Sequence, residues 1–375
     1  MGGVSRISTV LHDAIDHGVF PGAVVFVRFQ SEILYHEAVG VKGGPPYDQP
    51  VTVNTVYDLA SLTKPLATTT AVLSLIQAGI LRFEHTIADW IDVLQNSPFS
   101  ASTIRQLLNH SAGFPAWKPY YQRLAPAARK PEHETERQSR IETFLSYVAS
   151  ESLAYVPGST SVYSDLGFIV LGLIVEKGAR ESLATYCRNR IYDPLEVTTC
   201  SYLAGEEASR VEGLDDDSIA PTEEDPWRGR VVHGEVQDEN AYALGGIVGH
   251  AGLFGTAESV GCLTQEWLRG VHGQSTLLSP ELIRECVGRQ DATGGSSWAL
   301  GWDTPSVPSS AGQYFSDQSF GHLGYTGTSI WIDPARNLEV ILLSNRVHPT
   351  RENIKIKQFR PYLHDVVNEE MAKVD

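Results

Sequence analysis

The stretch Asp58-Leu59-Ala60-Ser61-Leu62-Thr63-Lys64 leads from a loop into a long apolar segment that extends to Leu81, and it holds the single Ser-x-x-Lys of the chain. If a helix begins near Ala60, Ser61 and Lys64 lie one turn apart on the same face, so the amine can reach the hydroxyl. The N–H groups and partial positive charge of a helix N-terminus also favour an oxyanion formed when Ser61 attacks a carbonyl. The stretch therefore predicts a nucleophile beside an amine, although this spacing also arises by chance and needs partner residues.

Strand-like segments lie on both sides of this stretch. Residues 22–29 and 33–40 are β-rich, and the short polar sequence between them predicts an antiparallel hairpin. Residues 328–332 and 338–343 flank the turn 333–337 and predict a second hairpin. The sheet is therefore expected to contain strands from both ends of the chain.

Helical patterns are also expected at both chain ends. An amphipathic first helix is predicted by apolar residues at helical spacing, namely Ile7, Val10, Leu11, Ala14 and Ile15. A final helix is expected to open near Pro361, with a buried face made of Leu363, Val366, Val367, Met371 and Val374. Both ends are therefore expected to pack against the same sheet.

The middle of the chain has a different character. Between about residues 82 and 257, helical patterns such as 141–148 and 167–177 alternate with long loops and an acidic stretch at 206–225. We therefore predict an α/β (α+β) fold, in which an antiparallel β-sheet is flanked by helices and an all-helical domain is inserted. Residues 1–81 and 258–375 are expected to form the discontinuous α/β domain and residues 82–257 the mostly helical domain, with the active-site cleft between them.

The composition disfavours several classes of function. The chain has 375 residues, of which 42% are hydrophobic and 20% charged, as is typical of a globular protein with a large core. A net charge of −16 argues against binding to nucleic acid or to an anionic membrane surface. The histidines show no metal-binding spacing. Buried free thiols rather than disulfides are predicted for the four widely spaced cysteines, Cys187, Cys200, Cys262 and Cys286.

The sequence also bears on location. The N-terminal residues 1–6 lack the basic segment and apolar run of an export signal, and the most apolar stretch, 168–175, is too short to span a bilayer. We therefore expect a cytoplasmic protein, unless a leader has been removed.

Two partners for Ser61 are predicted in Tyr163-Ser164-Asp165, which follows a turn and precedes an apolar helix. A phenol near the nucleophile can relay a proton, or act as a base when a cation stabilises the tyrosinate. Asp165 can hold Lys64 or a substrate amide. The alternative is that Tyr163 caps the helix with its ring half buried.

A third partner is predicted in His322-Leu323-Gly324, just before the strand at 328–332. It would place a cation or a hydrogen-bond donor beside the edge of the sheet, and the glycine would allow close backbone approach. A rival triplet starts at His250, but a helix-like segment follows it, so His322 is preferred. His110 is interpreted as a structural histidine held by backbone groups.

With these three elements in view, the chain resembles the serine β-lactamase and penicillin-binding-protein superfamily, and within it the class C and esterase branch. The resemblance spans most of the sequence and includes the segments 107–113, 157–167 and 249–256. It implies an antiparallel sheet flanked by helices, with an all-helical second domain.

The resemblance also implies roles for individual residues. Ser61 would be the acylated nucleophile, Lys64 its base partner and Tyr163 the proton relay. The backbone N–H groups of Ser61 and Tyr325 would form the oxyanion hole. Asp165 and His322 are departures, because class C enzymes usually have Asn and Lys there, and that Lys helps to hold a substrate carboxylate.

The predicted function is a serine hydrolase that acts through an acyl-enzyme on a small ester or amide, without a metal or organic cofactor. A mechanism in which Lys64 stays protonated and polarises Tyr163 is favoured. A carboxylesterase is preferred, because histidine at 322 weakens the grip on a carboxylate. The alternatives are a β-lactamase or D-amino-acid peptidase, and, from another class, a catalytically silent binding or scaffold protein. Three aromatic residues could line an acyl pocket or simply pack between domains, namely Trp117, Tyr120 and Tyr121.

Overall fold

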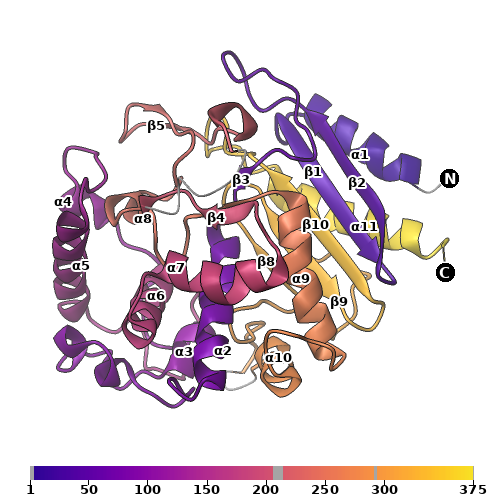
Figure 1. Ribbon diagram of the computed structural model, residues 1–375. Coiled ribbons are helices and arrows are strands. Elements are labelled where there is room, and N and C mark those ends of the chain that lie inside the picture. Colours follow the sequence, from indigo (N-terminus) through magenta and orange to yellow (C-terminus); the bar gives the residue numbers. More distant parts are fainter. Residues whose placement is uncertain (1–3, 206–213, 291–293, 375) are drawn as a thin grey trace.

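The computed structural model describes residues 4–205, 214–290 and 294–374. Its main sheet is antiparallel, with the strand order β2-β1-β10-β9-β8. These strands are β1 (Gly22–Phe29), β2 (Glu32–Gly40), β8 (Phe320–Leu323), β9 (Ser329–Asp333) and β10 (Leu338–Ser344). The two predicted hairpins are confirmed as β1–β2 and β9–β10, and β1 and β10 lie side by side at the centre of the sheet (Figure 1).

Both faces of this sheet are covered. In β1, Val25 and Val27 belong to the hydrophobic core shared with α1 (Val4–Asp16) and α11 (Ile356–Met371), where both chain ends meet (Figure 1). Val24 and Phe26 point to the opposite face and join the larger core, which includes α9 (Ala257–Val271). Because successive strand residues alternate between two buried faces, the whole of β1 is buried.

The final helix differs from the prediction in its bounds. α11 begins at Ile356, so Pro361 lies inside the helix rather than at its start. Val374 lies beyond the end of the helix and is exposed, so its assignment to the buried face was wrong. The other four residues predicted on that face are buried.

The middle of the chain is mainly helical. Its helices are α3 (Ile104–Leu108), α4 (Tyr121–Leu124), α5 (Glu134–Ala149), α6 (Asp165–Ala179), α7 (Leu183–Cys187) and α8 (Glu239–Ala243). Short strands are also present, namely β4 (Cys200–Tyr202), β5 (Glu224–Asp225), β6 (Arg230–Val231) and β7 (Leu253–Gly255). The first part of the acidic stretch, 206–213, lies outside the described residues.

One hydrophobic core connects this middle part to the sheet. It contains Phe168 and Val170 of α6 together with Ile330 of β9 and Ile341 of β10. The antiparallel sheet flanked by helices is thus confirmed, whereas the division at residues 81/82 and 257/258 stays a prediction. α10 (Pro280–Val287) packs against α9 on the same side of the sheet.

The predicted helix after Ala60 is present in an irregular form. It starts as a 3-10 turn, η1 (Ala60–Leu62), continues as a π-helical segment, η2 (Lys64–Thr69), and becomes regular in α2 (Thr70–Gln77). Pro65 has no N–H to donate at the start of this segment, and the Thr70 hydroxyl donates to the Pro65 carbonyl at 2.9 Å. Ser61 therefore lies on a tight turn ahead of the regular helix.

Candidate active site

The turn that carries Ser61 is strained and firmly held. Ala60 has a φ of +48°, a region that non-glycine residues rarely adopt and that costs about 1–3 kcal/mol. Asp58, at the end of β3 (Tyr57–Asp58), accepts the Ala60 N–H at 2.8 Å through one carboxylate oxygen and the Gln237 N–H at 2.7 Å through the other. The strain persists because these neighbours enforce it, and they set the position of Ser61.

The Lys64 side chain is completely buried and fully hydrogen-bonded. Its Nζ lies 3.0 Å from Ser61 Oγ, 2.7 Å from Asp165 Oδ1 and 3.1 Å from the His250 carbonyl oxygen. A carboxylate and a carbonyl can only accept, so an ammonium donates to all three oxygens. A neutral amine would donate to Asp165 and His250 and leave its lone pair for the Ser61 proton.

The electrostatic surroundings favour the ammonium form in the resting protein. Burial lowers the pKa of Lys64, but the nearby Asp165 carboxylate and Tyr163 outweigh this effect, so the pKa lies above the ordinary 10.5. This agrees with the sequence-based expectation that Lys64 stays protonated.

Tyr163 lies on the other side of Ser61. Its hydroxyl donates to Ser61 Oγ at 2.7 Å, and the Lys64 ammonium lies 4.7 Å from the centre of its ring. Burial raises the pKa of Tyr163 to about 12, although the Lys64 charge opposes the shift. The structure thus brings together four predicted residues, Ser61, Lys64, Tyr163 and Asp165, from two distant segments.

The segment at 324–328 is fastened to the Ser61 turn. Thr326 Oγ1 donates to the Asp58 carbonyl at 2.7 Å, and Thr328 Oγ1 donates to the Leu59 carbonyl at 3.1 Å. Gly324 is required here, because a Cβ would lie 1.9 Å from Thr328 Oγ1. Within the described residues, no acceptor pairs with the N–H of Ser61 or of Tyr325, so both remain available to a ligand.

His322 lies on β8, the edge strand of the sheet, and lines the same cavity as Ser61. Burial and the positive charge of Lys64 lower the pKa of His322 to about 3. Of the two possibilities expected at this position, a cation or a hydrogen-bond donor, the cation is disfavoured, because a protonated ring would be buried beside Lys64. His322 is a neutral imidazole.

His250, the rival to His322 in the sequence, also lines the cavity. The His250 carbonyl holds Lys64, and its ring Nε2 pairs with Asp238 Oδ1 at 2.9 Å. His110 accepts the Ser164 N–H at Nδ1, as expected of a structural histidine. Its ring packs against Tyr163 and Trp298 behind the site.

The cavity has a volume of about 660 Å³ and receives residues from three parts of the chain. Ser61 comes from the first part, Tyr163 and Asp165 come from the helical middle, and His322 and Tyr325 come from the last. Of the three aromatic residues considered for an acyl pocket, Trp117 lines the cavity. Tyr120 and Tyr121 instead pack against other aromatic rings, those of Phe144 and Trp227.

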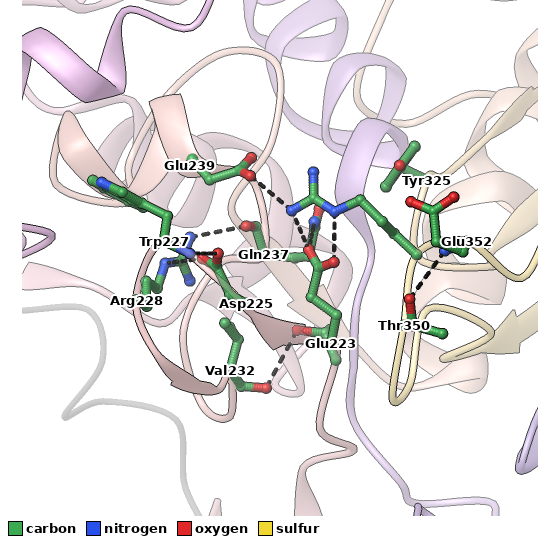
Figure 2. Close-up of polar contacts among 12 residues, drawn as sticks. Glu223, Asp225, Trp227, Arg228, Val232, Gln237, Glu239, Tyr325, Thr350 and Glu352 are labelled. Atoms are coloured by element: carbon green, nitrogen blue, oxygen red, sulfur yellow. Dashed lines mark hydrogen bonds and ion pairs between the residues drawn. The ribbon is translucent and has the colours of Figure 1, made fainter.

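A network of charged side chains, drawn in Figure 2, includes Glu239, which forms part of the cavity wall. Arg351 donates to both carboxylate oxygens of Glu223 at 2.5 Å and to Glu239 at 2.7 Å. Gln237 also donates to Glu223 through its side chain, and its backbone N–H donates to Asp58. The wall is thereby linked to the residue that holds the Ser61 turn.

Two more arginines line the cavity, Arg346 and Arg360. Both are almost fully buried, and they donate only to backbone carbonyls, including those of Tyr325 and Gly324. Burial lowers the pKa of Arg360 to about 9, so this guanidinium is still charged at pH 7. Within the described ranges, neither has a carboxylate at ion-pair distance.

Sequence reasoning missed Asp58, Asp238, Arg346, Arg351 and Arg360. No local motif marks them. Arg351 pairs with residues more than 100 positions away, and all five line a cavity that only the folded chain forms. Asp58 would have been the easiest of the five to predict from the sequence, because it lies three residues before Ser61. In the described part of the chain, no cluster of three or more His, Cys, Asp or Glu could hold a metal, and no helix is long and apolar enough to cross a bilayer.

The site is typical of a class of serine hydrolases, because it places a serine and a lysine one turn apart between an antiparallel sheet and a helical region. The sequence matches the Beta-lactamase family over residues 8–360, and the chain belongs to this family of serine hydrolases. A protein of Escherichia coli O157:H7, provisionally named D-alanyl-D-alanine carboxypeptidase, is 34% identical over 92% of this chain and 82% of its own. The resemblance predicted from the sequence is thus confirmed.

Solved structures share the fold. EstCE1, a hydrolase with promiscuous acyltransferase activity, aligns with a TM-score of 0.73 and 23% identity, covering 97% of this chain and 98% of its own. The octameric penicillin-binding protein homologue from Pyrococcus abyssi aligns with a TM-score of 0.71 and 19% identity, covering 97% of this chain and 78% of its own. At these identities the likeness extends to the fold alone.

Proposed function

We propose that this protein hydrolyses esters through an acyl-enzyme on Ser61, with Lys64 and Tyr163 as its proton-transfer partners. The supporting observation is that Ser61 Oγ lies 3.0 Å from Lys64 Nζ and 2.7 Å from the Tyr163 hydroxyl. Ser61 attacks the carbonyl, and the N–H groups of Ser61 and Tyr325 stabilise the oxyanion. The leaving alcohol takes a proton, and water then releases the acyl group through the same residues.

The proton of Ser61 needs an acceptor, and the two candidates differ in cost. Neutralising Lys64 at pH 7 from a pKa above 10.5 takes at least about 5 kcal/mol, and ionising Tyr163 from a pKa of about 12 takes about 7 kcal/mol. Both lie within a barrier of about 16 kcal/mol, which corresponds to roughly 10 turnovers per second. Because both groups contact Ser61 Oγ, the two deprotonated forms can interconvert through this hydroxyl, and the pair titrates as a unit.

Ester cleavage is the preferred reaction because the neutral ring of His322 offers no positive charge for a carboxylate at this position. An ester also has a better leaving group than an amide, so it places less demand on the proton donor. The division into two domains with the cleft between them is part of the same proposal, supported by the three-part origin of the cavity lining.

A second candidate is a carboxypeptidase acting on peptides that end in D-alanine. Arg346, Arg360 and the exposed Lys357 line the cavity and could hold a peptide carboxylate. The names of the E. coli and Salmonella relatives point the same way.

Labelling with a fluorophosphonate tests the nucleophile, and a substrate panel separates the two candidates. The wild type should gain the mass of the probe on the peptide that contains Ser61, and Ser61→Ala should not. The panel would contain p-nitrophenyl acetate for esterase activity, a chromogenic cephalosporin for β-lactamase activity and the peptide diacetyl-lysyl-D-alanyl-D-alanine for carboxypeptidase activity. Fastest turnover of the ester supports the esterase, and release of D-alanine with little ester cleavage supports the carboxypeptidase. No labelling and no turnover would instead favour a silent binding protein.

A cytoplasmic location is also proposed. Its support is that Cys187, Cys200, Cys262 and Cys286 are all unpaired, which fits a reducing compartment. Cell fractionation with a compartment marker tests it, and recovery in an extracytoplasmic fraction would contradict it.

A further inference from the structure

The His322 ring is held in one tautomer by its own strand. Its Nδ1 lies 2.9 Å from the carbonyl oxygen of Leu323. A carbonyl oxygen can only accept, so Nδ1 carries the ring proton. In a neutral ring, Nε2 is then a bare lone pair that can only accept a hydrogen bond.

This lone pair has no donor in the described part of the protein. His322 is 2% exposed, and its Nε2 is buried without a hydrogen-bond partner. An unsatisfied buried acceptor costs about 1–3 kcal/mol, so its persistence calls for an explanation.

Lys64 and Tyr163, two nearby donors, are already engaged. The hydrogens of Lys64 are directed to Ser61, Asp165 and His250, and the Tyr163 hydroxyl donates to Ser61. The other close groups are the ring of Trp298, 5.7 Å between ring centres, and that of Tyr163, 6.0 Å away.

His322 forms part of the wall of the cavity that contains Ser61. It lines the cavity together with Ser61, Trp298 and Gly324, and it is three residues from the proposed oxyanion N–H of Tyr325. A substrate bound for attack by Ser61 occupies the same cavity, so the groups next to its scissile carbonyl can approach this part of the wall.

We infer that His322 Nε2 selects substrates with an uncharged hydrogen-bond donor, an amide N–H or a hydroxyl, within a few atoms of the scissile carbonyl. Carboxylates are disfavoured at this point, because an oxygen without a proton would face a nitrogen lone pair. The basic side chains of Arg346 and Arg360 lie elsewhere on the cavity wall, so charge recognition and donor recognition are separate. The inference rests on the proposed acylation of Ser61.

The test is a double-mutant cycle with matched esters. One pair is the p-nitrophenyl ester of N-acetylglycine and that of N-acetyl-N-methylglycine, which lacks the N–H. The other is 2-hydroxyethyl butanoate and 2-methoxyethyl butanoate. The ratio of kcat/KM between donor and blocked ester should be about ten-fold larger in the wild type than in His322→Leu for at least one pair, as expected for one hydrogen bond. His322→Gln, which retains an acceptor oxygen, should recover part of the ratio.

The preference should also be constant from pH 5 to pH 9, because His322 does not titrate there. Equal ratios in wild type and His322→Leu for both pairs would overturn the inference while leaving ester hydrolysis intact. Absence of any turnover would instead overturn the proposed function. A nitrogen-15 NMR spectrum of the wild type, assigned with His322→Gln, provides a measurement that does not depend on a folded leucine variant. It should show His322 with a protonated Nδ1 and a bare Nε2, and a proton on Nε2 would refute the inference.

Discussion

Replacing Asp165 by asparagine would leave the Lys64 ammonium buried without its carboxylate. The two charges lie 2.7 Å apart, and at an effective dielectric constant of 20 their attraction is about 6 kcal/mol. Asp165 is 19% exposed, so solvent screens part of this value, and removal of one partner from a buried pair typically costs about 3–5 kcal/mol. The buried ammonium can also lose its proton, so the free-energy cost of deprotonating Lys64 limits the destabilisation to a similar value. We therefore expect Asp165→Asn to lose about 3–5 kcal/mol of unfolding free energy at pH 7.

The pH dependence distinguishes this explanation from a general packing defect. In the wild type, the pKa of Lys64 is raised, so its contribution to stability is present below 10.5 and is lost as the pH rises through the folded-state pKa. In Asp165→Asn, Tyr163 alone opposes burial, which is the largest influence and lowers the pKa of Lys64, so stability increases with pH until the unfolded chain also loses the proton. The difference between variant and wild type should therefore shrink between pH 7 and pH 11.

Urea unfolding followed by tryptophan fluorescence measures both quantities, provided that the slope with denaturant is unchanged. The matched control is Glu285→Gln, which breaks the exposed Arg105–Glu285 pair at 2.6 Å and should cost less than about 1 kcal/mol. A loss below 1 kcal/mol in Asp165→Asn, or a loss that does not vary with pH, would refute the reasoning.

Three further predictions concern the surroundings of Ser61. Tyr163→Phe removes the hydroxyl that contacts Ser61 Oγ, so kcat for an ester should fall by about 10²- to 10⁴-fold; full activity beside an inactive Ser61→Ala would reject the role of Tyr163. Burial raises the pKa of Asp58 to about 6, so the contribution of Asp58 to stability is present below pH 3.8 and is lost as the pH rises through 6. Between pH 4 and pH 7.5, the unfolding free energy of Asp58→Asn should therefore rise by up to about 3 kcal/mol relative to that of the wild type. Urea unfolding measures this difference, and no relative gain would contradict the prediction. Gly249→Ala would place a Cβ 2.1 Å from the Phe168 carbonyl, so it should lower the unfolding free energy by at least about 1–3 kcal/mol and lower the Tm. The control is Gly44→Ala, whose Cβ meets no atom within 4 Å and should leave the Tm unchanged. Equal Tm values for the two variants would show that the backbone at residue 249 can shift to make room.

Much of the fold was predictable because its signals are local. The hairpins β1–β2 and β9–β10 follow from β-rich segments joined by short polar turns, and both are present. The start of α11 was not predictable in this way. Pro361 is usually a helix-start signal, but the helix continues through it, because Ile356 and Phe359 pack into the core beneath the sheet.

The site was predictable to the extent that its residues stand in short motifs. Ser61 and Lys64 are one turn apart by spacing alone, and Tyr163 and Asp165 share one triplet, so both pairs were named from the sequence. The contact between the two pairs was not predictable in this way, because Lys64 Nζ and Asp165 Oδ1, 2.7 Å apart in the fold, belong to residues 101 positions apart in the sequence. Asp58, Arg346 and Arg360 carry no motif and became visible only through their contacts and their place in the cavity wall.

The sequence by itself determined the family, the two hairpins of the main sheet and the identity of the central Ser61–Lys64 pair, because these depend on local patterns and motifs. The tertiary structure decided the charge states. Lys64 stays an ammonium because Asp165 lies beside it, and His322 stays neutral because it is buried beside Lys64. Protonation depends on desolvation and on charges brought together from distant parts of the chain, so the sequence alone could not indicate that the pKa of His322 is lowered.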